Sequence, residues 1–153
     1  MTDRQASERS TDEIMLDHVG VAVADYERSK AFYKRALAPL GLTLLLEFSE
    51  AAAGFGKDEG GRPSFFIEAH GEPPRGRLHI AFRAESREQV DAFHAAALEA
   101  GGTDNGAPGL RWYHADYYGA YVLDPDGHNI EAVCHQPGRE VVLAPATDSD
   151  DPG

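Results

Sequence analysis

The chain has 153 residues, and its 26 Asp and Glu against 14 Lys and Arg give a formal net charge of −12. The length suits one domain with its own core, and 42% hydrophobic with 26% charged residues is typical of a globular chain. The negative charge disfavours nucleic acid and anionic membranes as partners. No stretch reaches the roughly 20 apolar residues of a membrane span, and a polar N-terminus with a single cysteine predicts a cytoplasmic protein without disulfides.

One domain is expected between two polar ends. Residues 1–13 and 136–153 are rich in charged residues and lack aromatic ones, so the sequence predicts solvated tails there. The domain then spans residues 14–135. A turn-rich segment, GEPPRG, divides it into two modules of about residues 14–70 and 77–135.

The first module begins with a strand over residues 14–24, in which His18 and two small residues alternate with three valines. Asp25 is placed to cap a helix that ends at Gly41. Three shorter strands are expected to follow, over residues 42–48, 51–56 and 63–70.

The second module repeats this order in part. A strand over residues 77–84 and a helix over 86–100 precede a glycine-containing run that we expect to be flexible, and two further strands close the module, over residues 117–123 and 129–134. The sequence Asp-Pro-Asp-Gly between these last strands is a strong hairpin signal, since Pro fixes one turn residue and Gly supplies a positive φ.

The two modules also share residues. His18 and His79 open the first strand of each module, 61 positions apart, and the tripeptide Ile-Glu-Ala recurs around Glu68 and Glu131, 63 positions apart. Apolar matches between two such segments arise by chance, but a shared His and a shared Glu do not follow from core packing. The sequence therefore predicts an α+β fold made by tandem duplication of a β-α-β-β-β unit.

The shared His and Glu residues point to a metal site. His18 and His79 share a strand face with small residues, which leaves space for a cleft, and a carboxylate in the middle of a strand is costly to bury without a partner. Two such halves bring together His18, His79, Glu68 and Glu131. Nitrogen and oxygen donors of this kind suit Zn²⁺, Ni²⁺, Co²⁺, Mn²⁺ or Fe²⁺.

Three segments resemble the vicinal oxygen chelate (VOC) superfamily, which includes glyoxalase I, extradiol dioxygenases and bleomycin-resistance proteins. They are LDHVGVAVADYERSKAFYKRAL, HIAF and YYGAYVLDPDGHNIEAV, and the resemblance covers about residues 14–135. It implies two βαβββ modules that form an incomplete barrel around a divalent metal. It also implies metal ligands at His18, His79 and Glu131, with Glu68 at the fourth-strand position. Members of the superfamily are often homodimers, some of which build each site from two chains.

The resemblance leaves the reaction open between three classes. With all four ligands, the set resembles glyoxalase I, a lyase or isomerase in which Glu68 and Glu131 are the candidate catalytic bases. The substrate is then a small molecule that chelates the metal through two neighbouring oxygens. Without Glu68, the set resembles the 2-His-1-carboxylate triad of Fe(II) extradiol dioxygenases. A metal-free antibiotic-binding or resistance protein is the third class.

An aromatic segment is the candidate substrate-binding region. It follows the glycine-containing run and supplies four residues that we expect to shape the mouth of the pocket, namely Arg111, Tyr113, His114 and Tyr118. Packing of the same aromatic residues to anchor a loop is an equally good interpretation of this segment.

Overall fold

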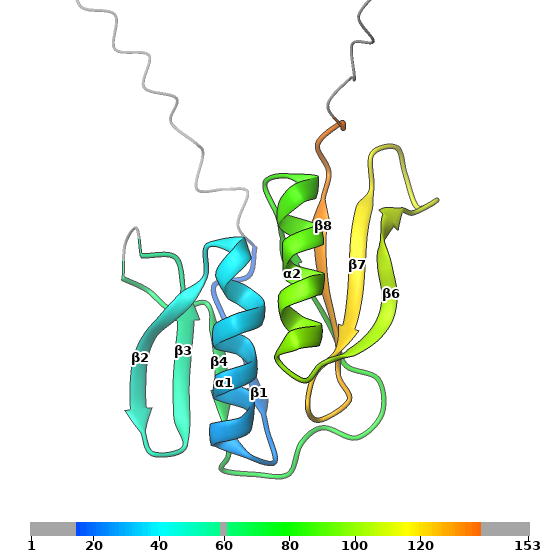
Figure 1. The fold of residues 1–153 in the computed structure, drawn as a ribbon. Helices are drawn as coiled ribbons and strands as arrows, with labels where there is room; N and C mark the ends of the chain where they lie inside the picture. The colour runs from blue at the N-terminus through cyan, green and yellow to red at the C-terminus, as the bar shows by residue number, and fades with distance from the viewer. Residues whose placement is uncertain (1–14, 59–60, 139–153) are drawn as a thin grey trace, which may run out of the picture.

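The computed structural model describes residues 15–58 and 61–138, which form two modules that lie side by side (Figure 1). The first comprises β1 (Val19–Ala22), α1 (Tyr26–Leu37), the 3-10 helix η2 (Ala38–Leu40), β2 (Thr43–Ser49), β3 (Ala52–Gly56) and β4 (Phe65–Glu68). The second comprises β5 (His79–Arg83), α2 (Arg87–Glu99), β6 (Thr103–Leu110), β7 (Tyr118–Leu123) and β8 (Asn129–Cys134). The predicted tails, residues 1–13 and 136–153, lie outside the described residues except for residues 136–138.

Each module has one four-stranded mixed sheet, with strand orders β1-β4-β3-β2 and β5-β8-β7-β6. The first strand of each module runs parallel to the last, and the other neighbours are antiparallel. This confirms the predicted α+β fold of two βαβββ modules. The two sheets are not closed into a barrel.

Local signals account for both helices. The side chain of Asp25 accepts a hydrogen bond from the backbone N of Arg28 at 3.0 Å, which caps α1, and Gly41 has the positive φ of 77° that follows η2. Ser86 caps α2 in the same way, through the backbone N of Gln89 at 3.2 Å. The prediction of these helix ends is confirmed.

The glycine-containing run after α2 is a strand, β6, and the expectation of a flexible segment is wrong. The strand pairs with β7 but is interrupted by register shifts on both sides of Gly106. Gly106 has a φ of 153°, and a Cβ there would lie 2.7 Å from the ring of Tyr121. Glycine is thus needed for a bulge and a close approach to β7, whereas a strand is usually recognised from side-chain alternation.

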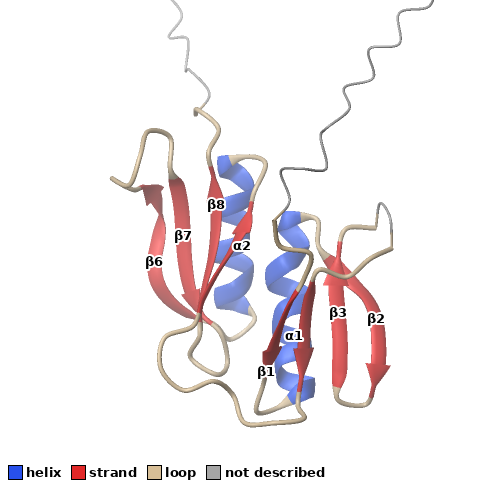
Figure 2. Ribbon diagram, turned by 180° about the vertical axis from the view of Figure 1, so that it is seen from behind, coloured by secondary structure: helices blue, strands red, loops and turns tan. Residues whose placement is uncertain are grey.

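The two modules pack through their helices, which lie side by side on the same face of the two sheets (Figure 2). The rings of Phe65 and Phe82 meet between the modules with centroids 5.2 Å apart. The buried hydroxyl of Tyr33 on α1 donates to Asp124 Oδ2 in the β7–β8 hairpin at 2.5 Å. This hairpin turns at Gly127, with a φ of 84°, as the sequence predicts.

The predicted strand faces are also confirmed. In β1 the valines face the helix side, where Val21 is buried, while Gly20 is exposed on the opposite side. In β5 the side chains of Ile80 and Phe82 pack against the core, and that of His79 lies on the open face. None of the helices among residues 15–58 and 61–138 has the length and hydropathy needed to cross a membrane.

Candidate functional site

The second module brings a histidine and a glutamate together on the open face of its sheet. Ala81 of β5 pairs with Glu131 of β8, so His79 lies two residues earlier on the same face. His79 Nε2 and Glu131 Oε2 are 2.7 Å apart, and the hydroxyl of Tyr117 donates to Glu131 Oε1. The carboxylate of Glu131 is completely buried, whereas the His79 side chain is half-exposed.

Gly119 on β7 makes room for this carboxylate. A Cβ at Gly119 would lie 3.1 Å from Glu131 Oε1, closer than ordinary van der Waals contact. A buried anion is costly unless it is paired and hydrogen-bonded. The absence of a side chain at Gly119 therefore leaves the space in which the buried carboxylate of Glu131 lies.

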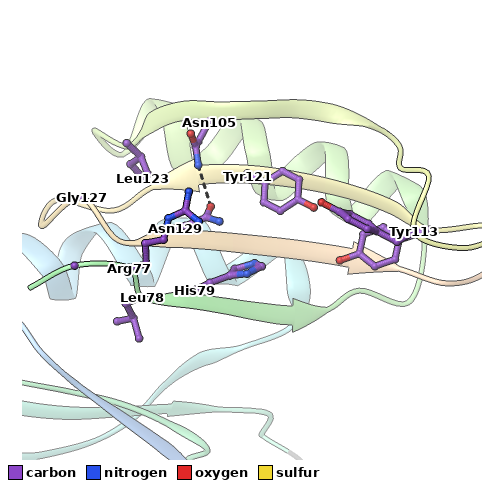
Figure 3. Close-up of a pocket in the computed structure, with 11 residues that line it drawn as sticks. Arg77, Leu78, His79, Asn105, Tyr113, Tyr121, Leu123, Gly127 and Asn129 are labelled. Carbon is purple, nitrogen blue, oxygen red and sulfur yellow. Dashed lines mark hydrogen bonds between the residues drawn. The ribbon is translucent and has the colours of Figure 1, made fainter. Parts of the chain in front are cut away.

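His79 lines a cavity of about 540 Å³ over the open face of the second sheet (Figure 3). Its other polar lining residues are Arg77, Asn105, Tyr113, Tyr117, Tyr121 and Asn129. Burial and the carboxylate of Glu131 raise the pKa values of Tyr117 and Tyr121 above the ordinary value of 10. Both phenols are therefore protonated at neutral pH and present hydroxyl donors.

The first module has a cavity of its own. His18, Phe66 and Glu68 line a space of about 630 Å³ on the open face of that sheet. His18 Nδ1 is hydrogen-bonded to Asp17 at 2.7 Å, and its ring meets the edge of Phe66 with centroids 5.5 Å apart. Glu68 is exposed to solvent.

The strand register assigns different positions to the two glutamates. In the second module, Ala81 lies two residues after His79 and pairs with Glu131. In the first module, Gly20 lies two residues after His18 and pairs with Phe66. Glu68 lies two residues farther along β4, on the same face, and pairs with Ala22. Phe66 therefore occupies the position in the first module that Glu131 occupies in the second. The repeated Ile-Glu-Ala tripeptides do not occupy equivalent positions.

The structure brings together only one pair of the four predicted metal ligands, His79 with Glu131. The other two line the separate cavity, and no three of the four have ligand atoms within 4.8 Å of one another.

Among the described residues, one group of three potential metal ligands has its ligand atoms within 4.8 Å of one another. It consists of Asp124, Asp126 and His128 in the β7–β8 hairpin. Asp124 already accepts hydrogen bonds from Tyr33 and from two backbone N–H groups, and Asp126 accepts one from the backbone N of Ala24. This triad has the composition of a cation site, and its carboxylates also hold the hairpin to the first module.

The four residues predicted to bind substrate have different surroundings. Tyr113 lines the cavity of His79, and the ring of His114 contacts that of Tyr117 with centroids 5.1 Å apart. Arg111 does not line the cavity, because its guanidinium lies over Tyr121 and donates to Ala107 O at 2.6 Å. Tyr118 lies on the helix side of the sheet, where its hydroxyl donates to Asp91 of α2 at 2.6 Å.

Several lining residues were not anticipated from the sequence. Tyr121 pairs directly with Glu131 across β7 and β8, so strand alternation around the hairpin was a signal that pointed to it. Arg77, Asn105 and Asn129 line this cavity from the segment before β5, from β6 and from the start of β8, which are far apart in the sequence. No local sequence pattern marks these three residues as neighbours.

Comparison with known proteins assigns the chain to a family. The sequence profile of the glyoxalase/bleomycin resistance protein/dioxygenase superfamily matches residues 15–132, and the chain belongs to this superfamily. No curated protein matches the chain.

Solved structures with the same fold include three bacterial proteins. A glyoxalase/bleomycin resistance protein from Albidiferax ferrireducens is 35% identical, with a TM-score of 0.67 over 81% of this chain and 100% of that one. A glyoxalase/bleomycin resistance protein/dioxygenase family enzyme from Burkholderia phytofirmans is 22% identical, with a TM-score of 0.62 over 78% and 98%. A lactoylglutathione lyase from Agrobacterium tumefaciens is 17% identical, with a TM-score of 0.57 over 82% and 96%. The last two likenesses concern the fold alone.

Proposed function

We propose that this protein is a metal-dependent enzyme that opens the aromatic ring of small catechols, an Fe(II) extradiol-type dioxygenase with His18, His79 and Glu131 as its metal ligands. The observation that carries the proposal is the register of β4. It places Phe66, which cannot bind a metal, at the position related to Glu131. The repeat then supplies two histidines and one carboxylate, the set typical of non-haem Fe(II) oxygenases with open coordination positions.

The residues present fit such a metal. Glu131 is completely buried, and its only ion-pair partner among the described residues is His79, so no Lys or Arg there neutralises it. The hydroxyl of Tyr117 holds its Oε1, and its Oε2 lies 2.7 Å from Nε2 of His79, the proposed second ligand. Hydrogen bonds from neighbouring groups of this kind fix the orientation of a ligating carboxylate. An imidazole nitrogen beside a carboxylate oxygen is a donor pair suited to Fe²⁺.

Fe²⁺ at this position would supply Lewis acidity and open positions for two neighbouring substrate oxygens and for dioxygen. The protonated hydroxyl of Tyr121 lies in the same cavity and is placed to donate a hydrogen bond to an anionic substrate oxygen, while Tyr117 holds Glu131. The imidazole of His114, whose ring contacts that of Tyr117, is the nearby group proposed to move protons.

A second copy of the chain is proposed to complete the site. His18 and His79 line separate cavities, and the modules of one chain meet through α1 and α2 rather than through the open faces of their sheets. Large apolar side chains are exposed in or beside both cavities, with Phe48 at 55%, Tyr113 at 54% and Trp112 at 88%. In a homodimer, the first module of one copy would face the second module of the other.

Mixed dimers test this assembly. A dimer of one His18→Ala chain and one His79→Ala chain contains one intact site if the ligands come from two copies, and none if they come from one. Random mixing of the two variants is then expected to restore bound iron to about one site in four. If the mixture bound no more iron, within experimental error, than either variant alone, the two-copy site would be overturned.

Turnover decides the reaction. The iron-loaded protein is mixed with catechol and substituted catechols, and oxygen consumption and the yellow ring-opened product are measured together. The proposal predicts both, and predicts that they require Fe²⁺. Isomerisation of a 2-oxoaldehyde adduct that depends on Glu68, without oxygen uptake, would favour the lyase or isomerase instead. Failure to bind any divalent metal would leave a metal-free binding protein.

A further inference from the structure

We infer that the cavity of the second module selects substrates that carry a carboxylate, held by Arg77 and the amide of Asn129. This inference rests on the proposed function, because it concerns the same substrate. It adds a substrate class, namely aromatic diols with an acid group.

The cavity has two chemically different ends (Figure 3). Arg77, Asn105 and Asn129 lie together at one end, Tyr113 and Tyr121 lie at the other, and His79 lies between them. A substrate whose diol oxygens are near His79 therefore has an aromatic wall on one side and a group of polar donors on the other. The volume of about 540 Å³ is within the range of small-molecule sites.

Arg77 has no counterion among the residues that the structure describes. It is the only Lys, Arg, Asp or Glu among the residues that line the cavity, although the whole chain has a formal charge of −12. Among the described residues, it makes no hydrogen bond and no ion pair, in contrast to its neighbour Arg75, which lies 3.3 Å from Glu72. A guanidinium presents a planar pair of donors that matches a carboxylate.

The amide pair beside Arg77 is oriented to add a donor. Asn105 Nδ2 donates to Asn129 Oδ1 at 3.1 Å, and this bond uses the acceptor oxygen of Asn129. The amide nitrogen of Asn129 is thereby turned to other partners, and none is found among the described residues. Guanidinium and amide N–H groups at one end of the cavity would be satisfied by the two oxygens of a substrate carboxylate.

Three probes separate the diol from the acid: catechol, 3,4-dihydroxybenzoate and its neutral isostere 3,4-dihydroxybenzamide. Binding to the iron-loaded protein is measured by calorimetry without oxygen. The intact protein is expected to bind the benzoate at least about tenfold more tightly than the benzamide, because charge-assisted hydrogen bonds are roughly twice as strong as neutral ones. Arg77→Gln should remove the preference and leave catechol affinity unchanged. Arg75→Gln, the matched control, should retain the preference.

The outcomes distinguish this inference from the function on which it rests. Equal affinity for benzoate and benzamide in the intact protein, or a preference that survives Arg77→Gln, would overturn the carboxylate site while leaving the diol site intact. Failure of all three probes to bind, with iron present, would overturn the proposed function itself. Iron content measured for each variant shows whether Arg77→Gln has disturbed the metal site.

Discussion

Two glutamates that look alike in the sequence are expected to respond very differently to loss of their charge. Glu131→Gln keeps the shape of the buried side chain but removes the anionic ligand. Metal affinity should fall by about 100-fold or more, which corresponds to about 2.7 kcal/mol. Glu68→Gln changes an exposed side chain one same-face position beyond Phe66, and its metal affinity should stay within about twofold.

The fold should tolerate both changes. Glu131→Gln weakens the two charge-assisted hydrogen bonds that the carboxylate accepts, from His79 and from Tyr117, at about 1 kcal/mol each. The neutral amide also removes the cost of burying a charge, which offsets part of this loss. The free energy of unfolding without metal is therefore expected to change by less than about 2 kcal/mol.

Calorimetric titration of each chelator-treated variant with Ni²⁺ or Co²⁺ gives the affinities, and urea unfolding gives the stabilities. The reasoning would be refuted if Glu131→Gln bound metal as tightly as the intact protein, or if Glu68→Gln lost as much affinity as Glu131→Gln. The second result would restore the four-ligand site predicted from the sequence.

Other predictions concern stability and the ligand set. Burial and Asp91 raise the pKa of Tyr118 to about 12, so the unfolded chain loses this proton above pH 10 while the folded chain keeps it. Stability should therefore fall as the pH rises from 10 to 12, measured by urea midpoints, and should fall less in Tyr118→Phe. Tyr33→Phe removes the buried bond to Asp124 and should lower the free energy of unfolding by about 1–3 kcal/mol. Phe66→Glu places a carboxylate at the position related to Glu131, and should raise metal affinity at least about tenfold while lowering oxygen consumption, because it fills an open position.

Each of these predictions has a contradicting result. An equal loss of stability between pH 10 and 12 in Tyr118→Phe and the intact protein would assign the effect to other phenols. Tyr26→Phe is the control for Tyr33→Phe, since its bond at 2.8 Å goes to the half-exposed Glu47, and a larger loss at Tyr26 would contradict the role of the module contact. Unchanged metal affinity in Phe66→Glu would contradict the register argument.

The parts of the fold that depend on local chemistry were predictable from the sequence. Helix caps at Asp25 and Ser86 are determined within four residues, and the turn at Gly127 needs only its positive φ. Alternation of valines with His18 showed which face of β1 meets the helices, because successive side chains of a strand point to opposite faces of the sheet.

Other features depend on contacts between distant segments. Strand β6 was not predictable because Gly106, at its bulge, is required by the close approach of the Tyr121 ring, which is 15 residues away in sequence. The position of Glu68 depends on the register of β4 against β1, and that register is set by the packing of the whole sheet rather than by the tripeptide around it. Whether two sequence halves share one cavity depends on how the modules pack, which the repeat does not specify.

The central claim is that His18, His79 and Glu131 hold one metal ion. Anomalous scattering from crystals of the cobalt-loaded protein locates that ion directly. We expect one cobalt per chain, bound by His79 and Glu131 of one copy and by His18 of a second copy, with Glu68 unbound. Cobalt at Asp124, Asp126 and His128 with none at His79, or cobalt bound by Glu68 in place of Glu131, would contradict this claim.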